Sequence, residues 1–144
     1  MGRLSTNEVD ALLEALDDEY KAWATYDGVI RDFGDIRPFI NIREAEARHI
    51  DALLGLFLDY GLTPPDNDWT GRVPRFHDVR SACVAAVQGE IANAELYERL
   101  LESTENPEIL DVYRNLMEAS QQRHLPAFQR CLNRGHSSAR RDTR

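Results

Sequence analysis

The 144-residue chain has 42% hydrophobic and 29% charged residues and a formal net charge of −8. This composition is typical of one globular domain with a buried core. The negative charge argues against a nucleic-acid-binding surface, and no apolar run is long enough for a transmembrane helix. The first residues lack the apolar stretch of a signal peptide, which favours a cytoplasmic protein.

Four helices are predicted, because apolar residues recur every three or four positions and no segment alternates with period two. Ser5 and Glu8 form a possible capping box at the first helix, which Gly34 ends. Asn106-Pro107 is a good start for the fourth helix, in which Pro126 should cause a kink or mark the end of the straight part. The predicted helices cover residues 6–33, 38–60, 78–103 and 107–133.

The connections between these helices differ greatly in length. The links at 34–37 and 104–106 are short, so they should join antiparallel neighbours. Residues 61–77 hold three prolines and read as a loop, which at ~3.3 Å per residue could span the ~35 Å of a helix of this length. The sequence therefore predicts an all-α four-helix bundle over 6–133 with a long crossover between helices two and three. Residues 134–144 are predicted to be a basic, disordered tail.

Polar side chains interrupt the apolar stripe of every predicted helix. Carboxylates driven into a core are costly and repel one another, unless they are paired or bind a cation. Two divalent cations would resolve this conflict, with imidazoles completing the ligands. Oxygen and nitrogen ligands without thiolate suit iron or manganese, with zinc as a common substitute. The candidate metal ligands are Glu19, Glu46, His49, Glu90, Gln121 and His124.

Two segments about 70 residues apart are similar, and each places a glutamate seven residues before a tyrosine. These tyrosines, Tyr26 and Tyr97, are candidate catalytic residues, either as hydrogen-bond donors to the metal ligands or in redox chemistry. The plainer interpretation is that they are core tyrosines whose hydroxyls find a carboxylate or water. Cys83 and Cys131 should lie at the same end of the bundle, either as a disulfide or redox pair or as two buried small side chains.

Five segments of the chain resemble the ferritin-like superfamily, and in particular an uncharacterised bacterial and archaeal branch of it. The resemblance covers about residues 6–133 and implies a di-iron or related di-metal centre that reacts with oxygen or peroxide. It assigns metal-ligand positions to Glu19, Glu46, His49, Glu90 and His124. The segments are Asp18-Glu19-Tyr20-Lys21-Ala22, Pro38-Phe39-Ile40-Asn41-Ile42, Ala45-Glu46-Ala47-Arg48-His49-Ile50, Asn67-Asp68-Trp69 and Arg123-His124-Leu125-Pro126-Ala127-Phe128.

One position departs from the ferritin-like pattern. A second Glu-x-x-His would place a glutamate at position 121, where this chain has Gln121. Ferritins tolerate glutamine on the fourth helix, where one metal is held more loosely. Metal binding is therefore still expected, but a symmetric centre with two bridging carboxylates is not.

The expected function is that of a di-iron carboxylate protein with ferroxidase-like or peroxidase-like chemistry. Its cofactors would be two iron ions, with manganese, a mixed iron–manganese pair or zinc as alternatives. Its partners would be oxygen or peroxide and an electron-donor protein, because the chain has no four-cysteine rubredoxin-like module. A homodimer or monomer is more natural than a shell, and neither nucleic acid nor a membrane is expected. The alternatives are a metal-free structural or interaction module and a metal-buffering protein.

Overall fold

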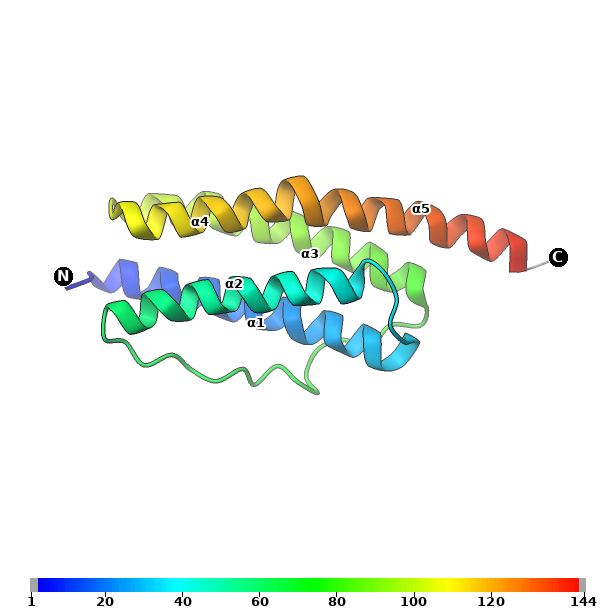
Figure 1. Cartoon of the computed structure of the whole chain (residues 1–144), viewed down its shortest axis with the longest axis horizontal. Helices are drawn as coiled ribbons and strands as arrows, with labels where there is room; N and C mark the ends of the chain where they lie inside the picture. The colour runs from blue at the N-terminus through cyan, green and yellow to red at the C-terminus, as the bar shows by residue number, and fades with distance from the viewer. Residues whose placement is uncertain (1–2, 143–144) are drawn as a thin grey trace.

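The structure is a computed structural model that describes the backbone of residues 3–142 and the side chains of residues 3–134. Within this part of the chain every regular element is helical, so the all-α prediction is confirmed (Figure 1). The predicted helix boundaries agree with the observed ones to within a few residues, except at the C-terminus. The elements are α1 (Thr6–Phe33), α2 (Phe39–Asp59), α3 (Val79–Leu100), η1 (Leu101–Ser103), α4 (Pro107–Ala119), η2 (Ser120–His124) and α5 (Leu125–Asp142).

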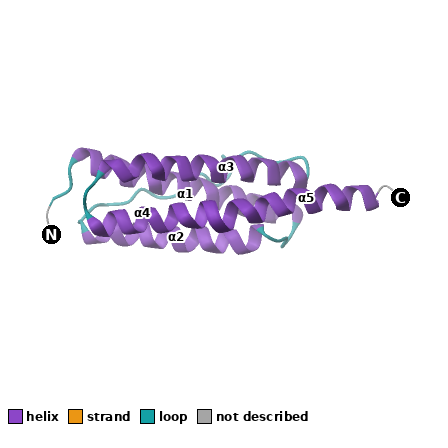
Figure 2. Cartoon of the chain, turned by 90° about the horizontal axis from the view of Figure 1, so that it is seen from above, coloured by secondary structure: helices purple, strands orange, loops and turns teal. Residues whose placement is uncertain are grey.

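The helices form an elongated bundle in which the connection after α2 is long. Figure 1 shows this connection leaving one end of the bundle and returning along its side to the other end, where α3 begins. As a result α2 and α3 run in the same direction, while α1 and α2 run in opposite directions. The segments α4, η2 and α5 follow one another as a single continuous rod, which is clear in Figure 2.

The helix ends use the signals found in the sequence. The Ser5 hydroxyl accepts a bond from the Glu8 backbone N–H, and the Glu8 carboxylate accepts one from the Ser5 N–H, so the capping box is present. Asn106 caps α4 by accepting from the Glu108 N–H at 3.0 Å, with Pro107 in the first turn. Gly34 ends α1 with φ of 92°, a conformation that favours glycine.

The fourth helix differs from the prediction in two ways. Its irregular segment is the five-residue π-helix η2, which ends two residues before Pro126, whose missing N–H prevents a regular α-helical bond there. The helix also continues to Asp142 rather than ending near Asn133. The side chains from residue 135 onward lie outside the described set, so the proposed disordered tail over 134–144 stays a prediction.

The long connection is attached to α1 along its course. The Tyr20 hydroxyl donates to the Pro65 carbonyl oxygen at 2.8 Å, and the Asn67 amide donates to the Tyr20 carbonyl oxygen at 3.1 Å. The Trp69 ring N–H donates to the Asp17 carboxylate at 2.9 Å. These bonds satisfy polar groups at the helix surface and fix the loop against α1.

The apolar core consists of two clusters separated along the bundle. The first includes Leu12, Leu16, Leu53 and Tyr113, and the second includes Phe39, Phe128 and the two cysteines. On α1 the first cluster ends at Tyr20 and the second includes Tyr26, which leaves a short segment between them. The buried polar residues of the candidate site occupy this middle layer.

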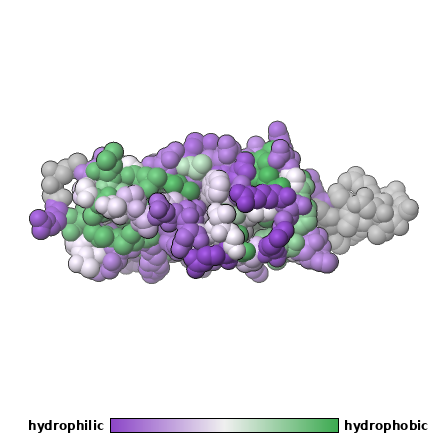
Figure 3. Space-filling model, turned by 90° about the horizontal axis from the view of Figure 1, so that it is seen from below, coloured by the Kyte–Doolittle hydropathy of each residue, from purple (hydrophilic) through white to green (hydrophobic). Residues whose placement is uncertain are grey.

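Hydrophilic side chains cover much of the surface face in Figure 3, where hydrophobic side chains gather toward the end at which the chain begins. Among the described residues, the large hydrophobic side chains that remain exposed are Leu13, Leu58 and Ile91. None of the helices within this part of the chain is both long enough and apolar enough to cross a lipid bilayer.

Cys83 on α3 and Cys131 on α5 are joined by a disulfide, with their Cα atoms 6.3 Å apart. Both residues are almost fully buried in the second core cluster. Of the two alternatives that the sequence left open, the structure contains the disulfide. It ties the start of α3 to the rod of α4, η2 and α5.

We expect reduction of this disulfide to lower the free energy of unfolding by about 2 to 4 kcal/mol, because it closes a long loop in the unfolded chain. Urea unfolding with and without a phosphine reductant measures the difference. The Cys83→Ala, Cys131→Ala double variant is the control and should not respond to the reductant. An unchanged midpoint for the reduced wild-type protein would contradict a stabilising disulfide.

Candidate metal centre

Five of the six predicted ligand residues meet in the middle layer of the bundle. They form two groups, each with two carboxylates and one imidazole, and within each group one ligand atom per residue lies within 4.8 Å of the others. The carboxylates of Glu19, Glu46 and Glu90 are at most 3% exposed. The two groups are Glu19, Glu46 and His49, and Glu46, Glu90 and His124.

Glu46 belongs to both groups and is the centre of the arrangement. Its Oε1 atom lies 3.0 Å from His49 Nδ1, and its Oε2 atom lies 3.8 Å from His124 Nδ1. His49 Nδ1 is also 3.4 Å from Glu19, and His124 Nδ1 is 3.3 Å from Glu90. The two imidazole rings stack with centroids 5.3 Å apart. One carboxylate thus faces two similar sets of ligand atoms, as a bridging ligand would.

The two tyrosines reach across the bundle to the outer carboxylates. Tyr97 on α3 donates to Glu19 Oε2 on α1, and Tyr26 on α1 donates to Glu90 Oε2 on α3, each at 2.6 Å. Burial, followed by the neighbouring carboxylate charges, raises the pKa of both hydroxyls well above the usual value. They therefore stay protonated and hold the orientation of Glu19 and Glu90.

Gln121 is the predicted ligand that the structure does not bring into the site. Its side chain is exposed, and the buried Ser120 occupies the corresponding place. The Ser120 hydroxyl lies 2.7 Å from Glu90 Oε1 and 2.9 Å from the Glu90 carbonyl oxygen. The reason is the π-helical segment, in which the Leu125 N–H bonds to the Ser120 carbonyl five residues back and so changes the register of the helix.

Asp18 and Asn93 are further polar residues at the site that the sequence reasoning did not select. The Asn93 amide donates to Asp18 Oδ2 at 2.7 Å and to Glu19 Oε2 at 3.2 Å. Burial raises the pKa of Asp18 to about 6, although the Asn93 bond acts in the opposite direction. Asn93 lies three residues after Glu90, and this helical spacing was the signal available in the sequence.

Two buried carboxylate oxygens, Glu19 Oε1 and Glu46 Oε1, form no hydrogen bond, although His49 Nδ1 lies 3.4 Å and 3.0 Å from them. Burial, with the charges of Glu19 and Glu90, raises the pKa of Glu46 well above its ordinary value. Burial alone would also raise the pKa of Glu19, but bonds from His49, Glu46 and Tyr97 outweigh it and lower this pKa to about 2. Without a cation, the Glu46 carboxyl therefore favours its protonated form.

The donor set fits divalent metal ions on this geometric evidence. The unpartnered oxygens of Glu19 and Glu46 face the imidazole nitrogen of His49, while hydroxyl donors occupy the opposite oxygens of Glu19 and Glu90. Carboxylate and imidazole ligands suit iron, manganese or zinc.

The metal-free protein should lose stability as the pH rises, because the folded state holds the Glu46 proton more tightly than the unfolded chain does. The loss begins near the ordinary glutamate pKa of 4.5 and continues through the raised folded value, at up to about 1.4 kcal/mol per pH unit. Ionisation of Asp18 also lowers the stability of the folded protein as the pH rises, but only up to about pH 6. Urea unfolding in EDTA at several pH values measures the slope.

Glu46→Gln should remove the slope above about pH 6, while Glu44→Gln, at an exposed glutamate of the same helix, should keep it. Equal slopes for the wild-type protein and Glu46→Gln would mean that the Glu46 carboxyl ionises freely in the folded state.

No family model matches the sequence. The uncharacterized protein MJ0754 of Methanocaldococcus jannaschii is 30% identical to this chain, over 90% of this chain and 77% of the archaeal protein. The crystal structure of hypothetical protein MJ0754 has a TM-score of 0.84 at 24% identity, covering 94% of this chain and 85% of that one.

A second solved structure extends the likeness in fold. The conserved hypothetical protein rv2844 from Mycobacterium tuberculosis has a TM-score of 0.70 at 16% identity, covering 89% of this chain and 92% of that one. At this identity the likeness concerns the fold alone. The sequence match to the archaeal protein is the stronger finding, and on that basis the chain belongs to the MJ0754 family.

Proposed function

We propose that this protein is a ferritin-like four-helix-bundle protein that holds two divalent metal ions, iron in the first place, and reacts with oxygen or peroxide. The observation that carries the proposal is that Glu46 belongs to both groups, each of which has two carboxylates and one imidazole. This resembles the ligand plan of carboxylate-bridged di-metal sites in helix bundles, without the glutamate of the second Glu-x-x-His motif. The long connection after α2, which makes α2 and α3 parallel, also fits the ferritin type of topology (Figure 1).

The charges in the site support two cations rather than one. Three carboxylates would nearly balance two divalent ions, whereas one ion would leave the remaining carboxylates repelling each other in a buried layer. His49 and His124 each provide Nδ1 to a different group. Because Gln121 supplies no ligand, two ions held by Glu19, Glu46, His49, Glu90 and His124 would have room for a small ligand.

Two bound iron ions would supply electrons to oxygen or peroxide. The protein's own residues orient the ligands and control protons. The Tyr97 hydroxyl holds Glu19 through Oε2, and the Tyr26 hydroxyl holds Glu90 through Oε2. The Ser120 hydroxyl donates to Oε1 of Glu90. Tyr26 also lines the pocket that reaches the site.

A metal-free interaction or structural module is the competing function. The feature that favours it is the set of tyrosine, serine and asparagine donors that already bond the carboxylates, with a proton on Glu46 replacing the metal. A metal-buffering protein is a third possibility, which would bind iron without consuming oxygen. The following experiments separate the three.

The wild-type protein expressed with supplemental iron should contain about two equivalents of metal, measured by plasma mass spectrometry. His49→Ala and His124→Ala should each lose about one equivalent, since each histidine serves one group. Glu46→Ala should lose nearly all metal because Glu46 serves both groups. Gln121→Ala is the matched control and should keep both equivalents, because its side chain is exposed.

No metal in the wild-type protein after expression with supplemental iron would support the structural module instead. Loss of metal in Gln121→Ala would mean that this residue enters the site after all.

The iron-loaded protein should consume oxygen or hydrogen peroxide in proportion to its bound ferrous iron, followed with an oxygen electrode or a peroxide assay. Glu46→Ala should consume neither beyond the rate of free iron, because it lacks the bridging carboxylate. The Gln121→Ala variant should react like the wild-type protein. Two bound iron ions without consumption of either oxidant would favour metal buffering.

A further inference from the structure

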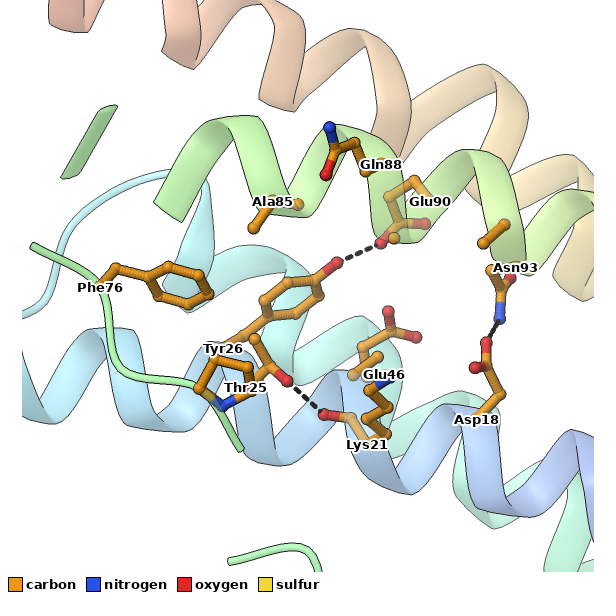
Figure 4. A pocket seen from close by; sticks show the side chains of 15 residues that line it. Asp18, Lys21, Thr25, Tyr26, Glu46, Phe76, Ala85, Gln88, Glu90 and Asn93 are labelled. Atoms are coloured by element: carbon orange, nitrogen blue, oxygen red, sulfur yellow. Dashed lines mark hydrogen bonds between the residues drawn. The ribbon is translucent and has the colours of Figure 1, made fainter. Parts of the chain in front are cut away.

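A pocket of about 330 Å³ lies between α1 and α3 and ends at the carboxylates of the candidate metal centre. Figure 4 shows Glu46 and Glu90 at this end, with Tyr26 crossing the pocket to reach Glu90. We propose that the pocket binds a small organic ligand with an apolar body and one polar end directed at Glu46 and Glu90. The contact of the polar end with a metal ion rests on the proposed function, whereas the pocket itself does not.

Small side chains create the space between the two helices. Ala85, Gly89 and Ala92 are spaced four and three residues apart, so they share one face of α3, and Ala22 lines the pocket from α1. A Cβ atom added at Gly89 would meet no atom within 4 Å apart from its own helix. Gly89 and Ala92 are exposed, so the pocket opens to solvent on this face of the bundle, and its small side chains leave room for a ligand above Glu46 and Glu90.

The outer wall comes from the long connection. Pro74 and Phe76 line the pocket, and the loop beside them is held to α1 by an ion pair between Arg75 and Asp32. Together with the alanines, these side chains give the pocket a mainly carbon surface. Such a surface suits an apolar ligand body, because binding there removes apolar area from water.

The inner end of the pocket has a different character. Glu46 is 3% exposed and lines the pocket, and its Oε1 atom forms no hydrogen bond although His49 Nδ1 lies 3.0 Å away. Asp18 and Asn93 also line this region and bond each other at 2.7 Å, so their mutual requirement is already met. A ligand that places a hydroxyl or another polar head at this end would satisfy the free carboxylate, or the cation bound to it.

The volume limits the size of the ligand. Small-molecule sites usually have about 300 to 1,000 Å³, so this pocket is at the lower end of the range. A single aromatic ring with a short polar substituent is the appropriate class, and benzyl alcohol is a suitable probe of it. Molecular oxygen and hydrogen peroxide would occupy only a small part of this space.

Benzyl alcohol titrated into metal-free protein with 13C-labelled alanine methyl groups should give saturable shifts at the lining residues Ala22, Ala85, Ala86 and Ala92. The methyl groups of Ala11 and Ala15, buried in the other core cluster, are the internal reference and should not shift. Gly89→Phe should weaken binding about tenfold or more by filling the pocket, while Gly89→Ala should change it little. Ala92→Phe is a second filling variant, should the first fail to fold.

Shifts distributed over alanines elsewhere, or equal affinity in the filled variants and in Gly89→Ala, would contradict ligand binding in this pocket.

The direction of the polar end is tested on the metal-loaded protein with benzohydroxamate and acetohydroxamate, which share a chelating head and differ in the phenyl ring. The phenyl compound should bind about tenfold more tightly, and Gly89→Phe should remove this preference at unchanged metal content.

The outcomes distinguish this inference from the proposed function. If the wild-type protein binds no metal, the proposed function fails, and the benzyl alcohol titration alone decides whether the pocket is a ligand site. If metal binds but the phenyl ring gives no preference, the proposed function stands and the orientation of the ligand is wrong.

Discussion

The buried layer of three carboxylates is the constraint on which the rest of the structure depends. Glu19, Glu46 and Glu90 are almost fully removed from water. Neighbouring carboxylates in this layer have oxygen atoms within 4.8 Å of one another, so their charges repel strongly. Apolar side chains cannot compensate them, so the core separates into two hydrophobic clusters with a polar layer between. Hydroxyl donors stabilise both oxygens of Glu90 and one oxygen of Glu19, and the Oε1 atoms of Glu19 and Glu46 are left for a proton or a cation.

The glutamate–tyrosine repeat makes sense only when α1 and α3 are considered together. Seven residues correspond to ~10 Å along a helix, so neither tyrosine can reach the glutamate of its own segment. On antiparallel helices the same spacing brings each tyrosine opposite the glutamate of the other helix, which gives the crossed pairs Tyr26–Glu90 and Tyr97–Glu19. These bonds fix the relative position of α1 and α3, and hence the distance between the two outer carboxylates.

Much of the fold could be predicted from the sequence, because capping residues, prolines and apolar spacing are local signals. The five residues that come together were also predictable, since a buried glutamate or histidine is unusual on an apolar stripe. Gln121 was misplaced because the prediction assumed a regular α-helix through a segment that is π-helical. Ser120 and Asn93 were missed because their role depends on contacts between helices, and a serine or asparagine on a helix has no distinctive pattern by itself.

The long connection links the topology of the bundle to the chemistry of its centre. A chain that turned directly from α2 into an antiparallel neighbour would need only a short loop, and nothing would cover the space beside α1. Here the loop returns along α1, is bonded to it at Tyr20 and Asp17, and places Phe76 over the gap that the small residues of α3 create. The residues that direct the chain back to start α3 therefore also shape the route to Glu46.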